Sequence, residues 1–302
     1  MKVLVTGGAG FIGSNLTRKL LNTGHEVVVL DNFSTGFPEN LHPDCQLIQG
    51  DVGLKETWDN LETVDVIYHL AAMVSVPVSM NDPIQCQRDN VDSVIYLIDY
   101  AKKHQVSKVI LASSAAVYGD KTQTQSELQL PAPKSPYGVS KLMDEHLLSM
   151  ALENFGLPFV AFRMFNIFGP YQSVSSAYAS VIPIFITKAL KNQDLTIYGD
   201  GLQTRDFVYV QQVVDYYIQA MTSKVTGVFN LGNGGSLNIL DLAEKIIRFT
   251  DSESKIEHKE IREGDIRVSQ AEIDHLTDNF TKIPIDFEDS LMQSIKYYRD
   301  KI

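Results

Sequence analysis

A tyrosine and a lysine four residues apart are the side chains of this sequence best suited to proton transfer. Tyr137 and Lys141 lie in the segment Tyr-Gly-Val-Ser-Lys, near the start of a predicted helix over Ser135–Asn154, so both project from one helix face. An ammonium group beside a phenol stabilises the phenolate, which can then remove a proton from a substrate hydroxyl. Such a spacing also arises by chance, so the interpretation depends on the motifs around it.

Two serines follow a strand-like segment and supply a possible partner for this base. Ser113 and Ser114 come directly after the apolar run Lys108–Ala112. In doubly wound folds, ligands bind at the carboxyl ends of the parallel strands. A serine hydroxyl at that edge can bond to the oxygen of a reacting alcohol or ketone and orient it toward Tyr137.

A glycine-rich turn near the amino terminus predicts a dinucleotide site. The strand Lys2–Thr6 leads into Gly7-Gly8-Ala9-Gly10-Phe11-Ile12-Gly13 and then into a helix over Ile12–Asn22. Gly7 permits the tight turn, Gly10 allows the backbone to approach a pyrophosphate, and Gly13 allows the helix to pack closely on the strand. The amino end of the helix then offers free amides to the phosphates.

Two acidic residues refine the choice of dinucleotide. The second strand, Glu26–Leu30, is followed by Asp31, whose carboxylate would accept hydrogen bonds from an adenosine ribose and repel a 2′-phosphate. The residues around Asp31 include no Arg or Lys, so the sequence favours NAD over NADP. Asp51, in Gly50-Asp51-Val52, is placed to meet the adenine amino group.

The order of elements predicts an α/β fold, a doubly wound parallel sheet of the Rossmann type with a smaller mixed C-terminal domain. Short apolar strands alternate with helical patterns in the first half, which is typical of parallel sheets covered on both faces. The expected strands are Lys2–Thr6, Glu26–Leu30, Gln46–Gln49, Val64–His69, Lys108–Ala112, Pro158–Arg163 and Val228–Leu231, and the further helices are Pro83–Gln105, Ile182–Lys191 and Ile239–Phe249. We expect an NAD-binding domain over residues 1–165 with a return segment near 207–231, and a substrate domain over 166–206 and 232–302.

Composition limits the classes of partner. The 302 residues include 26 Lys and Arg against 37 Asp and Glu, a net charge of −11, which repels nucleic acid and anionic membranes. An anionic ligand therefore needs a local group of cations or amides. Cys45 and Cys86 match no metal-binding spacing, so no metal site is expected, and two free thiols suit a reducing compartment. With no apolar run of about 18 residues, we expect a cytoplasmic protein.

Taken in order, these motifs resemble the extended short-chain dehydrogenase/reductase family and, within it, the UDP-sugar 4-epimerases. The resemblance covers nearly the whole chain. It rests on Thr6–Gly13, His69-Leu70-Ala71-Ala72, Ser113-Ser114 with Val117-Tyr118-Gly119, Tyr137 with Lys141, and Arg163-Met164-Phe165-Asn166. Met164 and Glu263 depart from the family pattern outside the proposed chemistry. The Ser114-Ala115-Ala116 segment lacks the Asp-Glu pair of related dehydratases, which disfavours dehydration.

The resemblance implies a permanently held NAD, with Tyr137 as base, Lys141 on the nicotinamide ribose and Ser114 as the hydrogen-bond partner. The implied cofactor contacts are Gly7, Gly10, Phe11, Ile12, Gly13, Asp31, Asn32, Asp51, Val52, Leu70, Ala71, Ala72, Asn90, Ser113, Tyr137, Lys141 and Phe165. The implied substrate contacts are Ser75, Ser114, Asn166, Val181, Tyr198, Arg205, Arg262, Asp265 and Ser269. Family members are usually homodimers, joined through helices corresponding to Pro83–Gln105 and Ser135–Asn154.

Within the substrate set, Arg205 and Arg262 match diphosphate-binding arginines of the family, and guanidinium groups suit diphosphate oxygens. Asn166 resembles a further diphosphate contact, Tyr198 the aromatic residue against uracil, and Asp265 a ribose contact. The segment Ala177–Pro183, which contains Val181, resembles the substrate loop of epimerases acting on N-acetylated hexosamines.

Two small residues point to an N-acetylated sugar. Ser269 stands where family members restricted to plain hexoses carry a bulky tyrosine, and the absent ring leaves room for an acetamido group. Ser75 likewise resembles the N-acetylhexosamine group, and Val74 replaces a lysine found in some hexose epimerases.

The sequence therefore predicts reversible 4-epimerisation of UDP-hexoses through a transient 4-keto sugar, with UDP-N-acetylglucosamine to UDP-N-acetylgalactosamine as the main reaction and UDP-glucose to UDP-galactose as a further one. Two alternatives remain open at this point. A nucleotide-sugar reductase or dehydrogenase would consume or release NAD(P)H stoichiometrically, and a dinucleotide sensor would need no base.

Overall fold

The main sheet of the protein contains seven parallel strands. The structure, a computed structural model, describes residues 1–120, 123–174, 180–261 and 266–302. The strands are β1 (Lys2–Thr6), β2 (Glu26–Asp31), β3 (Gln46–Gln49), β4 (Val66–His69), β5 (Lys108–Ser114), β6 (Phe159–Met164) and β11 (Gly227–Leu231). Their order across the sheet is β11-β6-β5-β4-β1-β2-β3, which confirms the doubly wound α/β fold predicted from the sequence.

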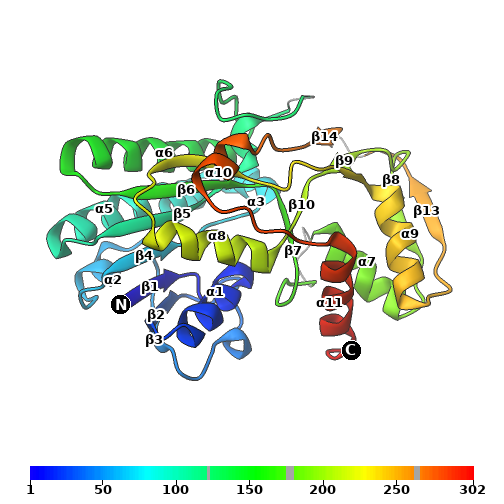
Figure 1. Ribbon diagram of the computed structural model, residues 1–302, viewed down its shortest axis with the longest axis horizontal. Coiled ribbons are helices and arrows are strands. Elements are labelled where there is room, and N and C mark those ends of the chain that lie inside the picture. The colour runs from blue at the N-terminus through cyan, green and yellow to red at the C-terminus, as the bar shows by residue number, and fades with distance from the viewer. Residues whose placement is uncertain (121–122, 175–179, 262–265) are drawn as a thin grey trace.

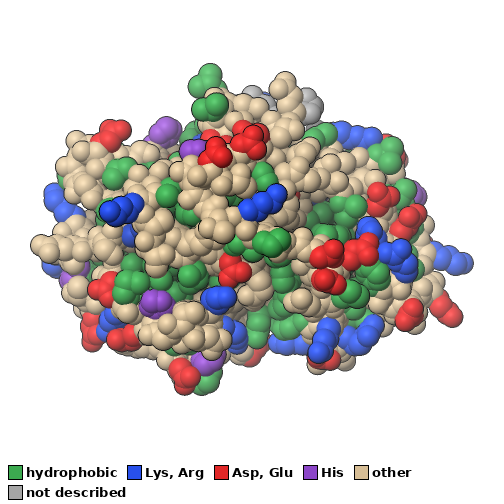
Figure 2. Space-filling view, viewed as in Figure 1, with side chains coloured by type: hydrophobic (Ala, Val, Ile, Leu, Met, Phe, Trp, Pro, Cys, Tyr) green, Lys and Arg blue, Asp and Glu red, His purple; other side chains and the backbone are tan. Residues whose placement is uncertain are grey.

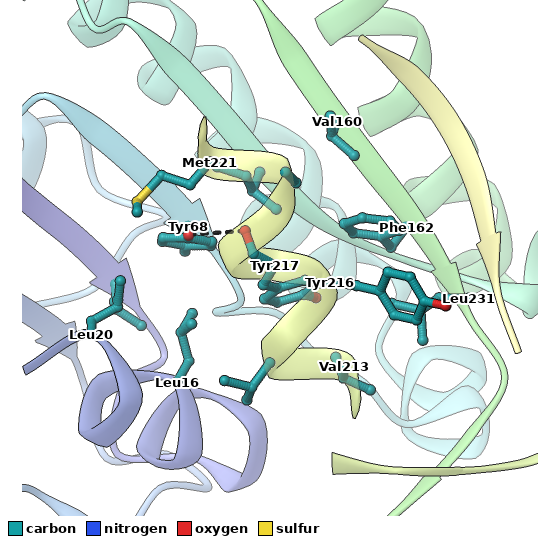
Figure 3. Close-up of a cluster of buried hydrophobic side chains, with 14 of the residues drawn as sticks. Leu16, Leu20, Tyr68, Val160, Phe162, Val213, Tyr216, Tyr217, Met221 and Leu231 are labelled. Atoms are coloured by element: carbon teal, nitrogen blue, oxygen red, sulfur yellow. Dashed lines mark hydrogen bonds between the residues drawn. The ribbon is translucent and has the colours of Figure 1, made fainter. Parts of the chain in front are cut away.

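Helices cover both faces of this sheet (Figure 1). One face carries α1 (Phe11–Asn22) and α8 (Val210–Thr222), and the other carries α2 (Lys55–Asp59), α5 (Ser93–His104) and α6 (Pro136–Phe155). Figure 3 shows the first face, where Tyr216 and Tyr217 of α8 lie among side chains of α1 and of the sheet. The Tyr68 hydroxyl of β4 donates to the backbone oxygen of Tyr217 at 3.0 Å.

The segment predicted as one helix over Pro83–Gln105 is divided into three. α4 (Pro83–Cys86) continues into a π-helical turn, η2 (Gln87–Asp92), and then into α5. A short helix that the sequence reading missed, α3 (Val76–Asn81), precedes them. Single π-helical turns are frequent at functional sites, and Asn90, inside this turn, is completely buried.

The remaining elements build a smaller region beside the sheet, on the right of Figure 1. The predicted helices there are confirmed as α7 (Val181–Leu190) and α9 (Ile239–Thr250), which share a core with α11 (Phe287–Arg299). Short strands complete the region: β7 (Asn166–Phe168) pairs with β10 (Phe207–Tyr209), β8 (Leu195–Tyr198) with β13 (Ile256–Lys259), and β9 (Thr204–Arg205) lies between β12 (Leu237–Asn238) and β14 (Val268–Ser269). Three other short helices, η1 (Pro38–Asn40), η3 (Ala115–Tyr118) and α10 (Asp274–Asn279), lie outside this region, next to the main sheet.

Charged side chains of both signs lie on the surface of the protein. Acidic and basic side chains are interspersed over the face of the molecule in Figure 2. Among the described residues, no helix has the length and apolar character needed to cross a lipid bilayer.

A buried polar network ties α6 to the centre of the sheet. The Arg163 guanidinium of β6 donates to both carboxylate oxygens of Glu145 on α6, at 3.0 and 2.7 Å. The Ser113 hydroxyl at the end of β5 donates to the same carboxylate at 2.5 Å. Arg163 also donates to the Tyr118 hydroxyl at 3.0 Å, and Tyr118 in turn donates to Asn230 of β11 at 2.6 Å. The network therefore fixes α6 against three adjacent strands.

We predict that Glu145→Gln lowers the free energy of unfolding by about 3–5 kcal/mol, because it leaves the buried Arg163 charge without a counter-ion. Chemical denaturation followed by circular dichroism measures the change. Asp59→Asn, which breaks the exposed pair between Lys55 and Asp59, serves as the control and should leave stability nearly unchanged. Equal effects of the two substitutions would contradict the role assigned to the network.

Candidate active site

The glycine-rich turn lies at the point where the sheet reverses its strand order. It follows β1, whose neighbour β4 is continued by Leu70, Ala71 and Ala72. Gly7 has a φ of +71°, and a Cβ atom added to it would lie 2.8 Å from the backbone nitrogen of Ala71. A Cβ atom on Gly13 would lie 2.2 Å from the Gly7 carbonyl oxygen. Both positions therefore require glycine for the turn to close on the sheet.

The amino end of α1 has the chemistry of an anion site. The residue at the N-cap position is Gly10, which has no side chain to accept hydrogen bonds from the amides of the first turn. The amides of Phe11, Ile12 and Gly13 belong to the first turn, where no preceding helical carbonyl is available. Glycine in place of a capping side chain thus leaves these donors for the phosphates of a dinucleotide.

Asp31 is fixed at the carboxyl end of β2, next to this turn. Its carboxylate is 7% exposed and accepts hydrogen bonds from the amides of Ala9 and Phe33, at 2.9 and 2.8 Å. The neighbouring Asn32 is exposed and accepts from Ser34. This arrangement holds an anionic acceptor where the first ribose of a dinucleotide would lie, and it fits the requirement for NAD.

The predicted adenine contact, Asp51, has a partner that the sequence reading missed. Its carboxylate pairs with the Arg88 guanidinium at 3.2 Å and accepts from the amide of Gly53 at 2.8 Å. Val52 is buried, and its carbonyl accepts from the indole of Trp58 at 2.9 Å. Arg88 lies in η2, far along the sequence, so no local spacing connects it with Asp51.

Thr6 and the buried His69 hold in place the segment after β4 that begins at Leu70. The Thr6 hydroxyl oxygen accepts from the amides of Leu70 and Ala71, each at 3.1 Å, and lies 3.0 Å from His69 Nδ1. The other ring nitrogen lies 3.1 Å from the Ser93 hydroxyl. Complete burial, with a further effect of the nearby Lys141 charge, lowers the pKa of His69 to about 3, so the ring is a neutral support for this segment.

The first turn of α6, which carries Tyr137, packs against the short helix that follows Ser114. A Cβ atom on Gly138 would lie 2.7 Å from the Ala116 carbonyl oxygen, so this turn is in close contact with η3, which begins directly after Ser114. The Tyr137 amide donates to Ser79 at 3.2 Å, and the Ser114 hydroxyl accepts from the amide of Ala116 at 3.1 Å. Both Tyr137 and Ser114 are partly exposed, as contact with a ligand requires.

Lys141, one turn further along α6, is buried and faces a carboxylate. Its ammonium lies 3.3 Å from Asp144, and the two side chains are 2% and 0% exposed. Burial, opposed in part by Lys141, raises the pKa of Asp144 to about 7. Sequence analysis identified Lys141 but did not consider Asp144, although the 4 + 3 spacing from Tyr137 places all three on one helix face.

Two predicted cofactor contacts use their polar groups within the protein. The Asn90 amide accepts from the backbone of Met73 and donates to Ser140, both at 2.8 Å. Ser113 is 1% exposed and bonded to Glu145. Both therefore support the segments around the site from behind. Phe165, 8% exposed, packs with Val117, Tyr118 and Ala271.

Four predicted substrate residues line one cavity of about 500 Å³ among the short strands and helices of the smaller region, namely Asn166, Val181, Tyr198 and Arg205. The Arg205 guanidinium donates to the carbonyl of Ile266 at 2.6 Å. Lys188, which sequence analysis did not select, also lines this cavity, and its ammonium lies 3.1 Å from the carbonyl of Asp194. The cavity thus contains two cationic side chains in an acidic protein.

The remaining substrate predictions have different outcomes. Ser269 lies opposite Arg205 in the pairing of β14 with β9, and its hydroxyl accepts from Asn166 at a long 3.4 Å. Ser75 caps α3 by accepting from the amide of Val78 at 3.2 Å. Arg262, Asp265 and residues 177–179 of the predicted substrate loop lie outside the described residues.

Comparison with known proteins agrees with this geometry. Residues 3–232 match the model of the NAD-dependent epimerase/dehydratase family. A curated relative named putative UDP-glucose 4-epimerase, from Methanocaldococcus jannaschii, is 32% identical over 99% of this chain and 98% of its own length. A UDP-N-acetyl-alpha-D-glucosaminuronate decarboxylase from Bacillus cytotoxicus is 39% identical over 85% of this chain and 83% of its own.

A solved structure has nearly the same course of the backbone. UDP-N-acetylglucosamine 4-epimerase from Methanobrevibacter ruminantium, in complex with UDP-N-acetylmuramic acid, superposes with a TM-score of 0.95 at 36% identity, covering 100% of this chain and 99% of that one. The predicted resemblance to extended short-chain dehydrogenases is thereby confirmed. With a family match over more than half of its length, this chain belongs to the NAD-dependent epimerase/dehydratase family, among its UDP-sugar epimerases and decarboxylases, and its cofactor is NAD.

Proposed function

We propose that this protein catalyses the reversible 4-epimerisation of UDP-hexoses, with UDP-N-acetylglucosamine as the preferred substrate and UDP-glucose as a further one. The observation that carries the proposal is the continuity between the base and the cavity. Ser114 pairs with Met164 across the sheet, and Asn166, two residues beyond Met164, lines the cavity that contains Arg205. A substrate whose diphosphate lies in the cavity can therefore extend its sugar to Ser114 and Tyr137.

The side chains around the sugar would remove one proton from the 4-hydroxyl and later return it. When bound, NAD supplies a reversible two-electron oxidation of the carbon that carries the 4-hydroxyl. Tyr137 removes the hydroxyl proton, Lys141 stabilises the phenolate before that transfer, and the Ser114 hydroxyl bonds to the sugar oxygen. The transient 4-keto sugar would then turn about its link to the diphosphate, so that reversal of the oxidation on the other face of the carbon, with return of the proton from Tyr137 to the oxygen, gives the C4 epimer.

The cavity would bind the part of the substrate that does not react. Arg205 and Lys188 supply positive charge toward the diphosphate, and Tyr198 presents an aromatic ring suited to the uracil base. Binding energy on this half of the substrate can hold it in place while the hexose remains free to turn.

One of the relatives indicates a second candidate reaction, decarboxylation. Because the chain is 39% identical to a decarboxylase of a UDP-uronic acid, we infer decarboxylation as the second candidate, with the same base and cofactor but a substrate that carries a carboxylate at C6. Epimerisation is favoured by the solved epimerase, which matches the whole chain.

The deciding assay uses the purified protein without added NAD. UDP-N-acetylglucosamine, UDP-glucose and the corresponding UDP-uronic acids are incubated separately, and the products are resolved by NMR. We expect the C4 epimers of the first two sugars with no net NADH. Release of carbon dioxide from a uronic acid without epimerisation of the neutral sugars would overturn the proposal in favour of decarboxylation. Stoichiometric NADH would identify a dehydrogenase.

Substitution of Tyr137 by Phe tests the base directly. The change removes only the hydroxyl, and we expect kcat to fall by about 10²- to 10⁴-fold, the usual range for loss of a general base, with NAD still bound. Tyr297→Phe, on α11 and outside the cavity lining, is the matched control and should retain full activity. An active Tyr137→Phe enzyme would exclude Tyr137 as the base.

The glycine turn is tested by Gly13→Ala. The added Cβ atom would lie 2.2 Å from a backbone oxygen, which must displace the turn, so we expect the dissociation constant for NAD to rise at least about tenfold, equivalent to 1.4 kcal/mol. NAD released from the denatured protein is quantified by chromatography. Gly235→Ala is the control, because that Cβ would meet no atom within 4 Å. Unchanged NAD content in Gly13→Ala would reject the site.

The choice of sugar is tested at Ser269. We expect Ser269→Tyr to fill the space beside Asn166 and to lower kcat/KM for UDP-N-acetylglucosamine relative to UDP-glucose by at least about tenfold. Ser269→Ala keeps the space and loses one long hydrogen bond, so its selectivity should match that of the unmodified protein. Equal losses on both sugars in the tyrosine variant would mean that Ser269 does not face the 2-substituent.

A further inference from the structure

Asp144 forms a buried ion pair with the lysine that supports the base. Its Oδ2 atom lies 3.3 Å from the Lys141 ammonium, and the two side chains are 0% and 2% exposed. The second carboxylate oxygen, Oδ1, is buried and has no hydrogen-bond partner among the described residues. An anion with one unsatisfied oxygen in a dry environment is costly, so a role limited to stability does not account for this residue.

Several other ionisable groups surround the pair, and Asp144 is the one whose pKa burial raises to about 7. His69, at the end of β4, stays neutral because burial lowers its pKa. Cys86, on α4, stays a thiol because burial raises its pKa. Glu145, next along α6, is held by Arg163, and Asp89 of η2 is bonded to Arg88 and Gln85. Tyr137, on the same helix face, is the base itself.

We propose that Asp144 is a positioning residue that holds the Lys141 ammonium and offsets part of its charge, and so limits how strongly Lys141 stabilises the Tyr137 phenolate. When Asp144 is ionised, Asp144 and Lys141 together carry almost no net charge. Tyr137, one helical turn from Lys141, then experiences little of the positive charge of the lysine. A protonated Asp144 leaves the full positive charge of Lys141 acting on the phenol. The inference deepens the proposed function and rests on it for the role of Tyr137.

The raised pKa of Asp144 agrees with the role that its contact with Lys141 indicates. Because burial raises the pKa of Asp144 to about 7, the carboxyl is largely protonated in acid and ionised above neutrality. The positive charge near Tyr137 is therefore greatest at low pH, where a phenolate is hardest to form, and decreases as the pH rises. The result is a broad pH range in which the base functions.

The test measures the ionisation of Tyr137 without any substrate. The NAD-loaded protein is titrated by tyrosinate absorbance, and the same titration of Tyr137→Phe is subtracted to isolate one phenol. Asp144→Asn keeps an acceptor for Lys141 and removes the charge. We expect the midpoint of the Tyr137 signal to fall by about 0.5–1 pH unit, less than the shift from a directly contacting charge. The acid limb of kcat/KM should move by the same amount.

Glu153→Gln is the matched control, because it removes one negative charge from an exposed position on the same helix. It should leave the midpoint unchanged. A midpoint in Asp144→Asn equal to that of the unmodified protein would overturn the proposal. The phenol titration requires no turnover, so a protein that fails to epimerise any sugar contradicts the proposed function while the titration still reports on Asp144.

A stability measurement separates the charge from a structural role. The folded-state pKa of Asp144 lies above the ordinary value of 3.8, so its contribution to stability is full below that value and is lost as the pH rises through about 7. The free energy of unfolding should therefore decrease relative to that of Asp144→Asn between about pH 4 and 8. The opposite trend would show that Asp144 stays ionised over this range, and would contradict the change of charge near neutral pH that the proposal assigns to it. If Asp144→Asn does not fold, Asp144→Ala is titrated in the same way.

Discussion

The inner face of α6 must place charged and polar side chains in an interior that excludes water. Lys141, Asp144 and Glu145 are all nearly inaccessible to solvent, and each buried charge would be strongly destabilising without a partner. The Glu145 carboxylate accepts hydrogen bonds from Arg163 and Ser113 of the main sheet, and these bonds offset the cost of burying its charge. Lys141 and Asp144 satisfy each other only in part, and Lys141 lies one helical turn from Tyr137 on α6. The packing that holds α6 on the sheet is thus the condition for the role proposed for Tyr137.

Close packing without unpaired charge is also required where the sheet reverses its strand order and the site lies. The glycine turn after β1 and the segment after β4 approach each other so closely that Gly7 could not carry a side chain. A neutral His69 behind that segment avoids a second positive charge next to Lys141. At the carboxyl edge of the sheet, the backbone amides proposed to bind the phosphates therefore lie on one side, and Lys141 with the proposed base Tyr137 lies on the other.

Sequence patterns were sufficient for the parts of the molecule that depend on local rules. The strands of the main sheet, the glycine turn and the start of α6 follow from apolar runs and turn residues, and the structure confirms them, with Ser135 as the cap of α6. The division of the helix over Pro83–Gln105 could not be predicted, because the π-helical turn at Asn90 is stabilised by contacts with Met73 and Ser140, which are distant in sequence. The pairing of Arg88 with Asp51 was missed for the same reason.

The substrate cavity illustrates a further limit of local patterns. Asn166, Tyr198 and Arg205 come from separate short strands, and only the assembled smaller region brings them together. Lys188 had no motif to distinguish it from other surface lysines, yet α7 places it in the cavity wall. Because the whole protein carries a net charge of −11, its long-range field opposes a diphosphate, and retention must come from contacts inside the cavity. A ligand held in this way by one end is compatible with a sugar that turns at the other.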